Sequence, residues 1–109
     1  MTAFELSQLL EQQHNQSRPY LEFLQVPSLS VGLYKLVAGA VDPQQPHTED
    51  EVYYVISGRS SFRCESEDRE VGPGSILYVP KGVEHRFYRI AEDLTILVFF
   101  APVEYSLKQ

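Results

Sequence analysis

Two histidines and one glutamate near the ends of predicted strands have the residue types of a metal site. His47 lies on a loop that leads into an aromatic and β-branched segment, and Glu51 stands at the start of that segment. His85 follows a turn built by Pro80 and Gly82, where another such segment begins. Two imidazoles and one carboxylate form the ligand set that Fe(II) favours, and the set also suits Mn, Ni or Zn. Residue types alone are a weak signal, because many sets of three polar residues could be drawn together.

The spacing of these residues adds a second signal, because they fall in two motifs, at 39–58 and 74–89. The first motif contains Gly39, Gln45, His47, Glu51 and Gly58. The second contains Gly74, Pro80, Gly82 and His85. In order and spacing the two motifs resemble the paired motifs of the cupin superfamily, which consists of small β-barrels. The chain departs from that family at Gln45, where the family has its first metal histidine, and at Arg89, where the second motif usually ends in asparagine.

The resemblance implies one bound divalent metal ion, either Fe, Mn, Ni or Zn. Carried over position by position, the metal ligands are His47, Glu51 and His85, with Gln45 in the fourth position. A glutamine oxygen is neutral and harder than an imidazole nitrogen, so Gln45 would ligate weakly or act from beside the ligands. Three strong ligands still suffice for a site with open positions, which catalysis requires.

The resemblance also implies a metal-dependent enzyme of the dioxygenase, isomerase or decarboxylase type, acting on a small oxygenated organic molecule. In such an enzyme the catalytic proton carrier would be Glu51 or Tyr53, and the sequence does not separate the two. Two other functions stay open. The chain could be a non-catalytic module that binds a small molecule or a metal, or a metal-free cupin isomerase with His47 or His85 as general base.

The segments around the motifs predict an all-β fold, an antiparallel double-sheet β-barrel (a cupin-like jelly roll) with a short N-terminal helix. Seven or eight short strands are expected from residue 20 onward, with Gly58 as a hairpin turn. Thr2 and Glu5 have capping-box spacing, and the helix should end by Gln16 because Arg18 precedes a proline. We expect a single domain over residues 1–109, with the helix and an arm in residues 1–18.

Strand alternation assigns side chains to the barrel interior. The candidate lining residues are Tyr53, Val55, Phe62, Tyr78, Phe87 and Phe99. Of these, Tyr53 and Tyr78 carry hydroxyls that could touch a ligand. Glu49 and Asp50 are expected on a solvated loop. Arg89 shares a face with His85 under strict alternation, so it either points inward to an anion or lies on the surface.

The segment 94–103 is apolar at nearly every position, which predicts that both faces of its strand are buried. A barrel of this size covers only the inner face of each strand. The outer face therefore needs the N-terminal helix, an N-terminal strand or a second subunit. We expect a homodimer that packs through this sheet.

Composition excludes several classes of partner. The net charge is −6 and the basic residues are scattered singly, so neither nucleic acid nor an anionic membrane surface is an expected partner. No apolar run approaches the roughly 18 residues of a membrane span. Cys64 is the only cysteine, so intramolecular disulfides are excluded. Residues 1–10 lack the features of a signal peptide, and we expect a cytoplasmic protein with a small-molecule ligand or substrate in the barrel.

Overall fold

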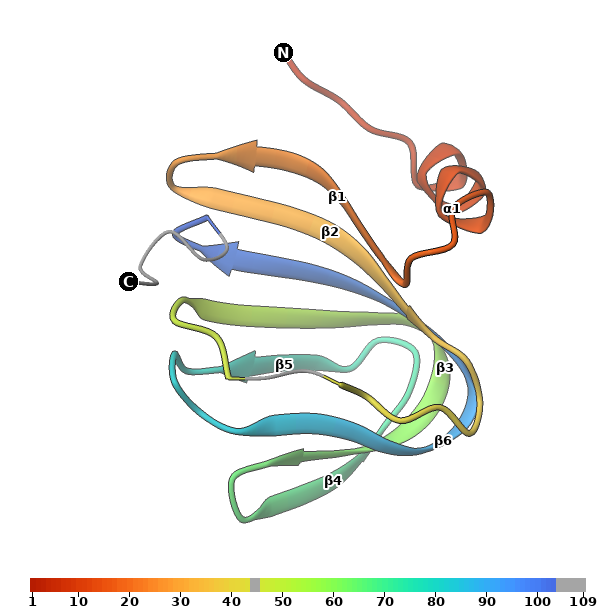
Figure 1. Ribbon diagram of the computed structural model, residues 1–109, viewed down its shortest axis with the longest axis vertical. Helices are drawn as coiled ribbons and strands as arrows, with labels where there is room; N and C mark the ends of the chain where they lie inside the picture. The colour runs from red at the N-terminus through yellow and green to blue at the C-terminus, as the bar shows by residue number, and fades with distance from the viewer. Residues whose placement is uncertain (44–45, 104–109) are drawn as a thin grey trace.

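The computed structural model describes residues 1–43 and 46–103 and shows antiparallel strands with one short N-terminal helix (Figure 1). The elements are α1 (Leu6–His14), β1 (Tyr20–Val26), β2 (Leu29–Leu36), β3 (Asp50–Cys64), β4 (Glu67–Val71), β5 (Ile76–Val79) and β6 (His85–Ala101). The expected all-β class with a short helix is therefore confirmed. Gln45 lies outside the described residues.

The strands form one six-stranded sheet in the order β1-β2-β6-β3-β4, and β5 pairs with β3 beside this path. The long strands β3 and β6 bend, so that each contributes to two layers (Figure 1). One end of β3 pairs with β5, and its other end, residues 60–64, pairs with β4. Within residues 1–43 and 46–103 no ladder joins β1 to β4, so the closed form of the predicted barrel is not confirmed.

The length of β3 corrects the prediction of a hairpin turn at Gly58. Gly58 has φ +95° and lies inside β3, where the register between β3 and β6 shifts. A Cβ at this position would overlap the carbonyl oxygen of Asp93, so only glycine fits the close approach of the two strands. The turn between β3 and β4 comes later, at Glu65, which has φ 54°. Because β3 and β6 run on through their bends, the structure has fewer strands than predicted.

The helix α1 ends at His14, before Gln16 as predicted, but its first turn is not a capping box. Glu5 is the N-cap, and no side chain caps the helix there. The buried amide of Gln13 donates to the backbone oxygens of Pro19 and Leu33, which ties the helix to β2. No helix in the described parts of the chain is long and apolar enough to cross a membrane.

The core lies between the two layers and consists of the inward-facing side chains of β2 to β6 and their neighbours. Its members are Tyr34, Leu36, Tyr53, Val55, Phe62, Val71, Leu77, Val79, Phe87, Ile90, Leu94, Ile96, Val98 and Phe100. Four of the predicted lining residues are thus buried in the core, namely Tyr53, Val55, Phe62 and Phe87. Aromatic contacts connect them, with the rings of Phe62 and Phe87 4.7 Å apart.

The other two predicted lining residues, Tyr78 and Phe99, face outward. Tyr78 is 61% exposed, and its neighbours Leu77 and Val79 are the buried residues of β5. Phe99 is half-buried, and Phe100 takes the inner position of β6. Both predictions were wrong by one residue, which is enough to move a side chain to the opposite face of a sheet.

The outer face of the sheet is covered only in part. Near β1 and β2 it lies against α1 and the N-terminal arm, and Leu33 there is fully buried (Figure 1). Toward β3 and β5 it remains apolar and accessible. We call this region the outer patch, and its residues are Val52, Tyr54, Ile76, Tyr78, Leu97 and Phe99. The outer side of residues 94–100 is therefore half-buried in this chain rather than buried as predicted.

Candidate metal centre

The side chains of His47, Glu51 and His85 converge on one point between the layers. All three are buried, and one ligand atom from each lies within 4.8 Å of the others. The Nε2 atom of His85 is 3.2 Å from Oε1 of Glu51, and the two imidazole centroids are 5.9 Å apart. The structure thus brings together the three residues that the spacing singled out.

The Glu51 carboxylate shows that this cluster suits a cation. Both of its oxygens are buried, and neither has a hydrogen-bond donor in the described part of the chain. The contact with His85 is an ion pair only when that ring is protonated, and the neutral ring offers Glu51 no compensating charge. A buried carboxylate without donors is unfavourable unless a positive charge compensates it. A divalent ion held by Glu51 and two imidazole nitrogens would supply that charge, so the residues fit a metal.

His85 is oriented by a backbone contact on the far side of its ring. It is the first residue of β6, and its Nδ1 lies 2.9 Å from the backbone oxygen of Val83. A carbonyl oxygen only accepts, so the proton of the neutral ring sits on Nδ1 and the lone pair sits on Nε2. That lone pair faces Glu51 and accepts from the hydroxyl of Tyr53 at 3.0 Å. Metal-binding histidines typically have such a backbone partner on the other nitrogen.

His47 is held by a contact between the loops of the two motifs. Its backbone oxygen accepts from the backbone nitrogen of Gly82 at 2.7 Å. Gly82 has φ +76°, a conformation that glycine adopts without strain. The His47 ring packs edge-on against Phe100, with centroids 4.6 Å apart. The turn around Gly82 therefore positions both histidines, since it also leads directly into His85.

The two histidines differ in their protonation. Burial lowers the pKa of His47, and the nearby Glu51 carboxylate offsets this only in part. Burial also acts to lower the pKa of His85, but the contacts with Glu51 and with the Val83 carbonyl outweigh it, so the net shift is upward. The lowered pKa favours the neutral, metal-binding form of the His47 ring. The raised pKa favours the protonated form of His85, which must release its proton before it binds a metal.

Glu49 corrects the prediction of a solvated acidic loop. Its side chain is 1% exposed and contacts the hydroxyl of Thr48, and its charge acts to raise the pKa of His47. Asp50, the next residue, is half-buried, and its carboxylate accepts from the Lys81 backbone nitrogen and the Tyr78 hydroxyl. The alternation between these neighbours sends Glu49 inward, although it is not part of the cluster around Glu51.

Asp42 is a buried carboxylate that the sequence interpretation missed. It is 2% exposed and accepts from the Tyr34 hydroxyl at 2.8 Å and from the Phe87 backbone nitrogen at 3.0 Å. Residues 39–42 thus lie against β6, because the Gly39 nitrogen donates to the Ile90 oxygen and the Phe87 nitrogen donates to Asp42. The only available signal was an acidic residue between Val41 and a proline, which is also typical of an ordinary turn.

Arg89 lies on the surface, the second of its two predicted alternatives. Its φ of 48° interrupts the alternation of β6, so that Ile90 is buried and Arg89 is exposed. The guanidinium carbon lies 5.8 Å from the centre of the Tyr88 ring. Arg89 therefore contributes no charge to the site.

The match to known proteins agrees with this geometry. The family model of the cupin domain matches residues 32–100. The matched range spans β2 to β6 and contains the convergent histidines and glutamate. The chain belongs to the cupin family.

Particular relatives extend the match over almost the whole chain. An uncharacterized protein of Streptomyces coelicolor is 47% identical over 104 residues, which cover 95% of this chain and 99% of the relative. The solved structure of TT1209 from Thermus thermophilus has a TM-score of 0.74 at 25% identity, covering 94% of this chain and 98% of that one. The DMSP lyase DddQ from Ruegeria pomeroyi has a TM-score of 0.68 at 25% identity, covering 77% of this chain and 42% of that one.

Proposed function

We propose that this protein is a metal-dependent cupin enzyme that acts on a small oxygenated organic molecule. The metal would be held by His47, Glu51 and His85, with Gln45 at or beside the fourth position. The reaction would be of the dioxygenase, isomerase or decarboxylase type. The similarity to a lyase of the same fold supports an enzymatic role for the cluster.

The observation that carries this proposal is the buried Glu51 carboxylate, which lies among two imidazole nitrogens and has no hydrogen-bond donor in the described part of the chain. A cluster meant only for stability would have satisfied these oxygens with donors. When bound, a divalent ion would act as a Lewis acid toward substrate oxygens at its open positions.

Tyr53 is the residue best placed to move a proton beside this cluster. Its side chain is fully buried and its hydroxyl donates to Nε2 of His85. Ligation would use the same Nε2 lone pair and would leave the Tyr53 hydroxyl without that acceptor. The hydroxyl could then donate to a bound substrate, which makes Tyr53 the proposed proton carrier. Glu51 would act mainly as a ligand, because both of its oxygens are buried and one of them lies within 4.8 Å of a nitrogen of each histidine.

Metal analysis of protein purified without a histidine tag tests the proposal. We expect close to one divalent ion per chain in the wild type and none in the His47→Ala, His85→Ala double variant. Equal trace metal in both proteins would contradict the proposed centre. Bound metal without turnover in a broad screen of small oxygenated compounds would favour the non-catalytic binding module instead.

We also propose that the protein forms a homodimer through the outer patch. Tyr54, Ile76 and Tyr78 are 39%, 68% and 61% exposed and lie on adjacent strands, with Tyr54 paired to Ile76. Contiguous exposed apolar groups of this kind are typical of protein interfaces. A second copy of the same sheet would cover them with a surface of the same chemistry.

A further inference from the structure

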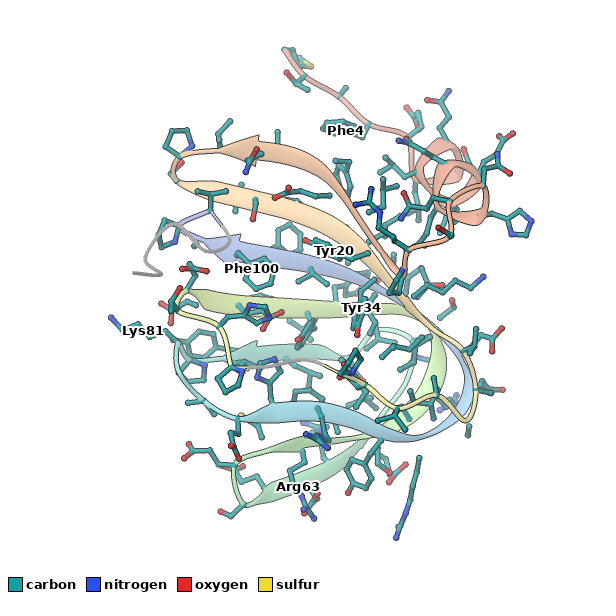
Figure 2. All side chains as sticks on the ribbon, viewed as in Figure 1. Phe4, Tyr20, Tyr34, Arg63, Lys81 and Phe100 are labelled. Carbon is teal, nitrogen blue, oxygen red and sulfur yellow. The ribbon has the colours of Figure 1, made fainter. Side chains whose placement is uncertain are left out.

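A cleft of about 400 Å³ opens between β4 and β5, away from the loop that carries His47. These two strands pair with opposite ends of β3, and no ladder joins them within the described residues. Figure 2 labels Arg63, which lies in β3 opposite Asp68 of β4, and Lys81, which follows β5 in the chain. The lining residues are Phe62, Cys64, Glu65, Glu67, Asp68, Arg69, Ile76, Leu77, Tyr78 and Pro80. Ile76 and Tyr78 also belong to the outer patch, so the cleft borders the proposed dimer interface. The volume is within the range of small-molecule sites.

The inner wall of this cleft is the back of the candidate metal centre. The Phe62 ring lies 5.9 Å from the Tyr53 ring and 6.3 Å from the His85 ring, measured between centroids. Cys64 is the strand partner of His85, and Leu77 is the strand partner of Tyr53. Phe62 and Cys64 therefore adjoin both the cleft and the residues of the cluster.

The charge of the cleft is negative. Glu65, Glu67 and Asp68 line it, against the single guanidinium of Arg69. Asp68 is compensated by Arg63, whose Nε lies 2.8 Å away. The other two carboxylates flank the turn next to Cys64, and together with burial they raise the pKa of that thiol. This negative field would oppose an anion that enters the cleft and would favour a cation.

We propose that the cleft between β4 and β5 is the approach by which small molecules reach the metal centre, and that it favours neutral and cationic molecules over anions. This inference rests on the proposed function, because it assumes the metal centre at His47, Glu51 and His85. It narrows the substrate class to oxygenated molecules without a net negative charge. It also assigns Phe62 the role of a positioning residue between the cleft and the cluster.

The charge preference is tested on metal-free protein with Cys64 as the only thiol. Two methanethiosulfonate reagents of similar size, one with a trimethylammonium group and one with a sulfonate group, are compared by their labelling rates. The urea-unfolded protein supplies the reference ratio, so that the intrinsic reactivity of the thiol cancels. We expect the cationic reagent to be favoured by about tenfold in the folded protein.

A double variant, Glu65→Gln with Glu67→Gln, should bring this ratio close to the unfolded reference. The matched control is Glu22→Gln, which removes an exposed carboxylate from β1 and should leave the ratio unchanged. A rate ratio in the folded wild type equal to that of the unfolded reference, or shifted toward the sulfonate reagent, would overturn the charge selectivity.

The route is tested with Co²⁺-loaded protein and imidazole, a small neutral metal ligand, titrated at about pH 8 and followed by visible absorption. Cys64 is first converted to its S-methyl or its S-benzyl disulfide. We expect the benzyl adduct to weaken imidazole binding by about tenfold or more while both adducts keep the Co²⁺ affinity of the unmodified protein. Where the benzyl group disturbs Co²⁺ binding, Glu67→Trp narrows the cleft from its rim and should give the same loss.

The outcomes separate the two proposals. Failure of the unmodified protein to bind Co²⁺ would contradict the proposed function itself. Normal Co²⁺ binding with unchanged imidazole affinity in the benzyl adduct and in Glu67→Trp would contradict the approach through the cleft and leave the metal centre standing.

Discussion

Glu51 and His85 lie 3.2 Å apart between Oε1 and Nε2, yet they belong to opposite ends of one strand ladder. Glu51 is paired with Phe100, and His85 is paired with Cys64. A straight ladder between these pairs would hold them roughly 40 Å apart at about 3.3 Å per residue. The bend of β3 and β6 around Gly58 brings the two ends of the ladder together. Residues that no local pattern relates become neighbours because the ladder folds back on itself.

Glu51→Gln should change stability and metal affinity in opposite directions. The metal-free wild type buries a carboxylate without donors, and glutamine removes that charge. We expect the metal-free variant to be more stable by about 1–2 kcal/mol at a pH above the raised pKa of His85, where the neutral ring does not compensate the charge. Metal affinity should fall by about a hundredfold, because the only anionic ligand is lost. Thermal unfolding without metal and titration calorimetry with Co²⁺ measure the two effects.

The control for that variant is Glu92→Gln, which removes an exposed carboxylate 3.8 Å from Arg59. It should change neither quantity measurably, because exposed ion pairs contribute little. A Glu51→Gln protein that is less stable without metal would show that the carboxylate is satisfied in solution.

Gly58→Ala should destabilise the fold and weaken metal binding together. The new Cβ would overlap the Asp93 carbonyl, and φ +95° is unfavourable for alanine. We expect a loss of about 2–4 kcal/mol in urea unfolding. Gly74→Ala is the matched control, since Gly74 has φ +91° and nothing within 4 Å of an added Cβ. It should lose only about 1 kcal/mol and keep its metal affinity. Equal losses in both variants would mean that the contact with Asp93 is unimportant.

Asp42→Ala should cost about 2–4 kcal/mol, because it leaves the Tyr34 hydroxyl and the Phe87 backbone nitrogen without this acceptor. Asp42→Asn keeps one oxygen acceptor and should lose about half as much. Hydrogen exchange at the Phe87 amide should accelerate in both. Asp93→Ala removes an acceptor from the exposed Ala38 nitrogen and serves as the control with a small effect. Unchanged exchange at Phe87 in the alanine variant would contradict the role assigned to Asp42.

Metal affinity should rise with pH. The pKa of His85 lies above 6.5, and binding requires that its ring release the proton. Below this pKa the affinity should fall by about tenfold for each pH unit, and above it the affinity should level off. The pKa of His47 is shifted the other way, downward through burial, so His47 loses its proton at a lower pH than His85 does. Co²⁺ titrations between about pH 5.5 and pH 8 measure the profile, and a flat profile below pH 6.5 would contradict the assignment.

Ile76→Glu should convert the proposed dimer into a monomer in sedimentation velocity, because it places a charge in the outer patch. Val41→Glu is the matched control, since Val41 is 81% exposed and lies outside the patch. It should leave the dimer intact. A monomeric wild type at micromolar concentration would contradict the proposed interface.

The strand pattern predicted the class of fold, and the resemblance of the two motifs to those of cupins predicted the three convergent side chains. The pairing of Pro80 and Gly82 before His85, and the fixed step from His47 to Glu51, are local patterns. Such patterns can be recognised in the sequence alone, because turn residues and short ligand spacings depend on nearby backbone geometry. The helix end before Gln16 was predictable for the same reason.

The rest depended on tertiary structure. Alternation assigns faces only relative to a starting residue, so one displaced step put Phe99 and Tyr78 on the wrong side. The acidic run before β3 predicted a solvated loop, whereas the fold buries Glu49. A glycine at position 58 is compatible with a hairpin turn and with a bend inside a strand. Only the close approach of the Asp93 carbonyl in the structure identifies the bend. The motif spacing indicated which residues could be ligands. Only the tertiary structure brings Glu51 and His85 together, because the β3–β6 ladder folds back on itself. Such a contact depends on strand pairing between residues far apart in the sequence.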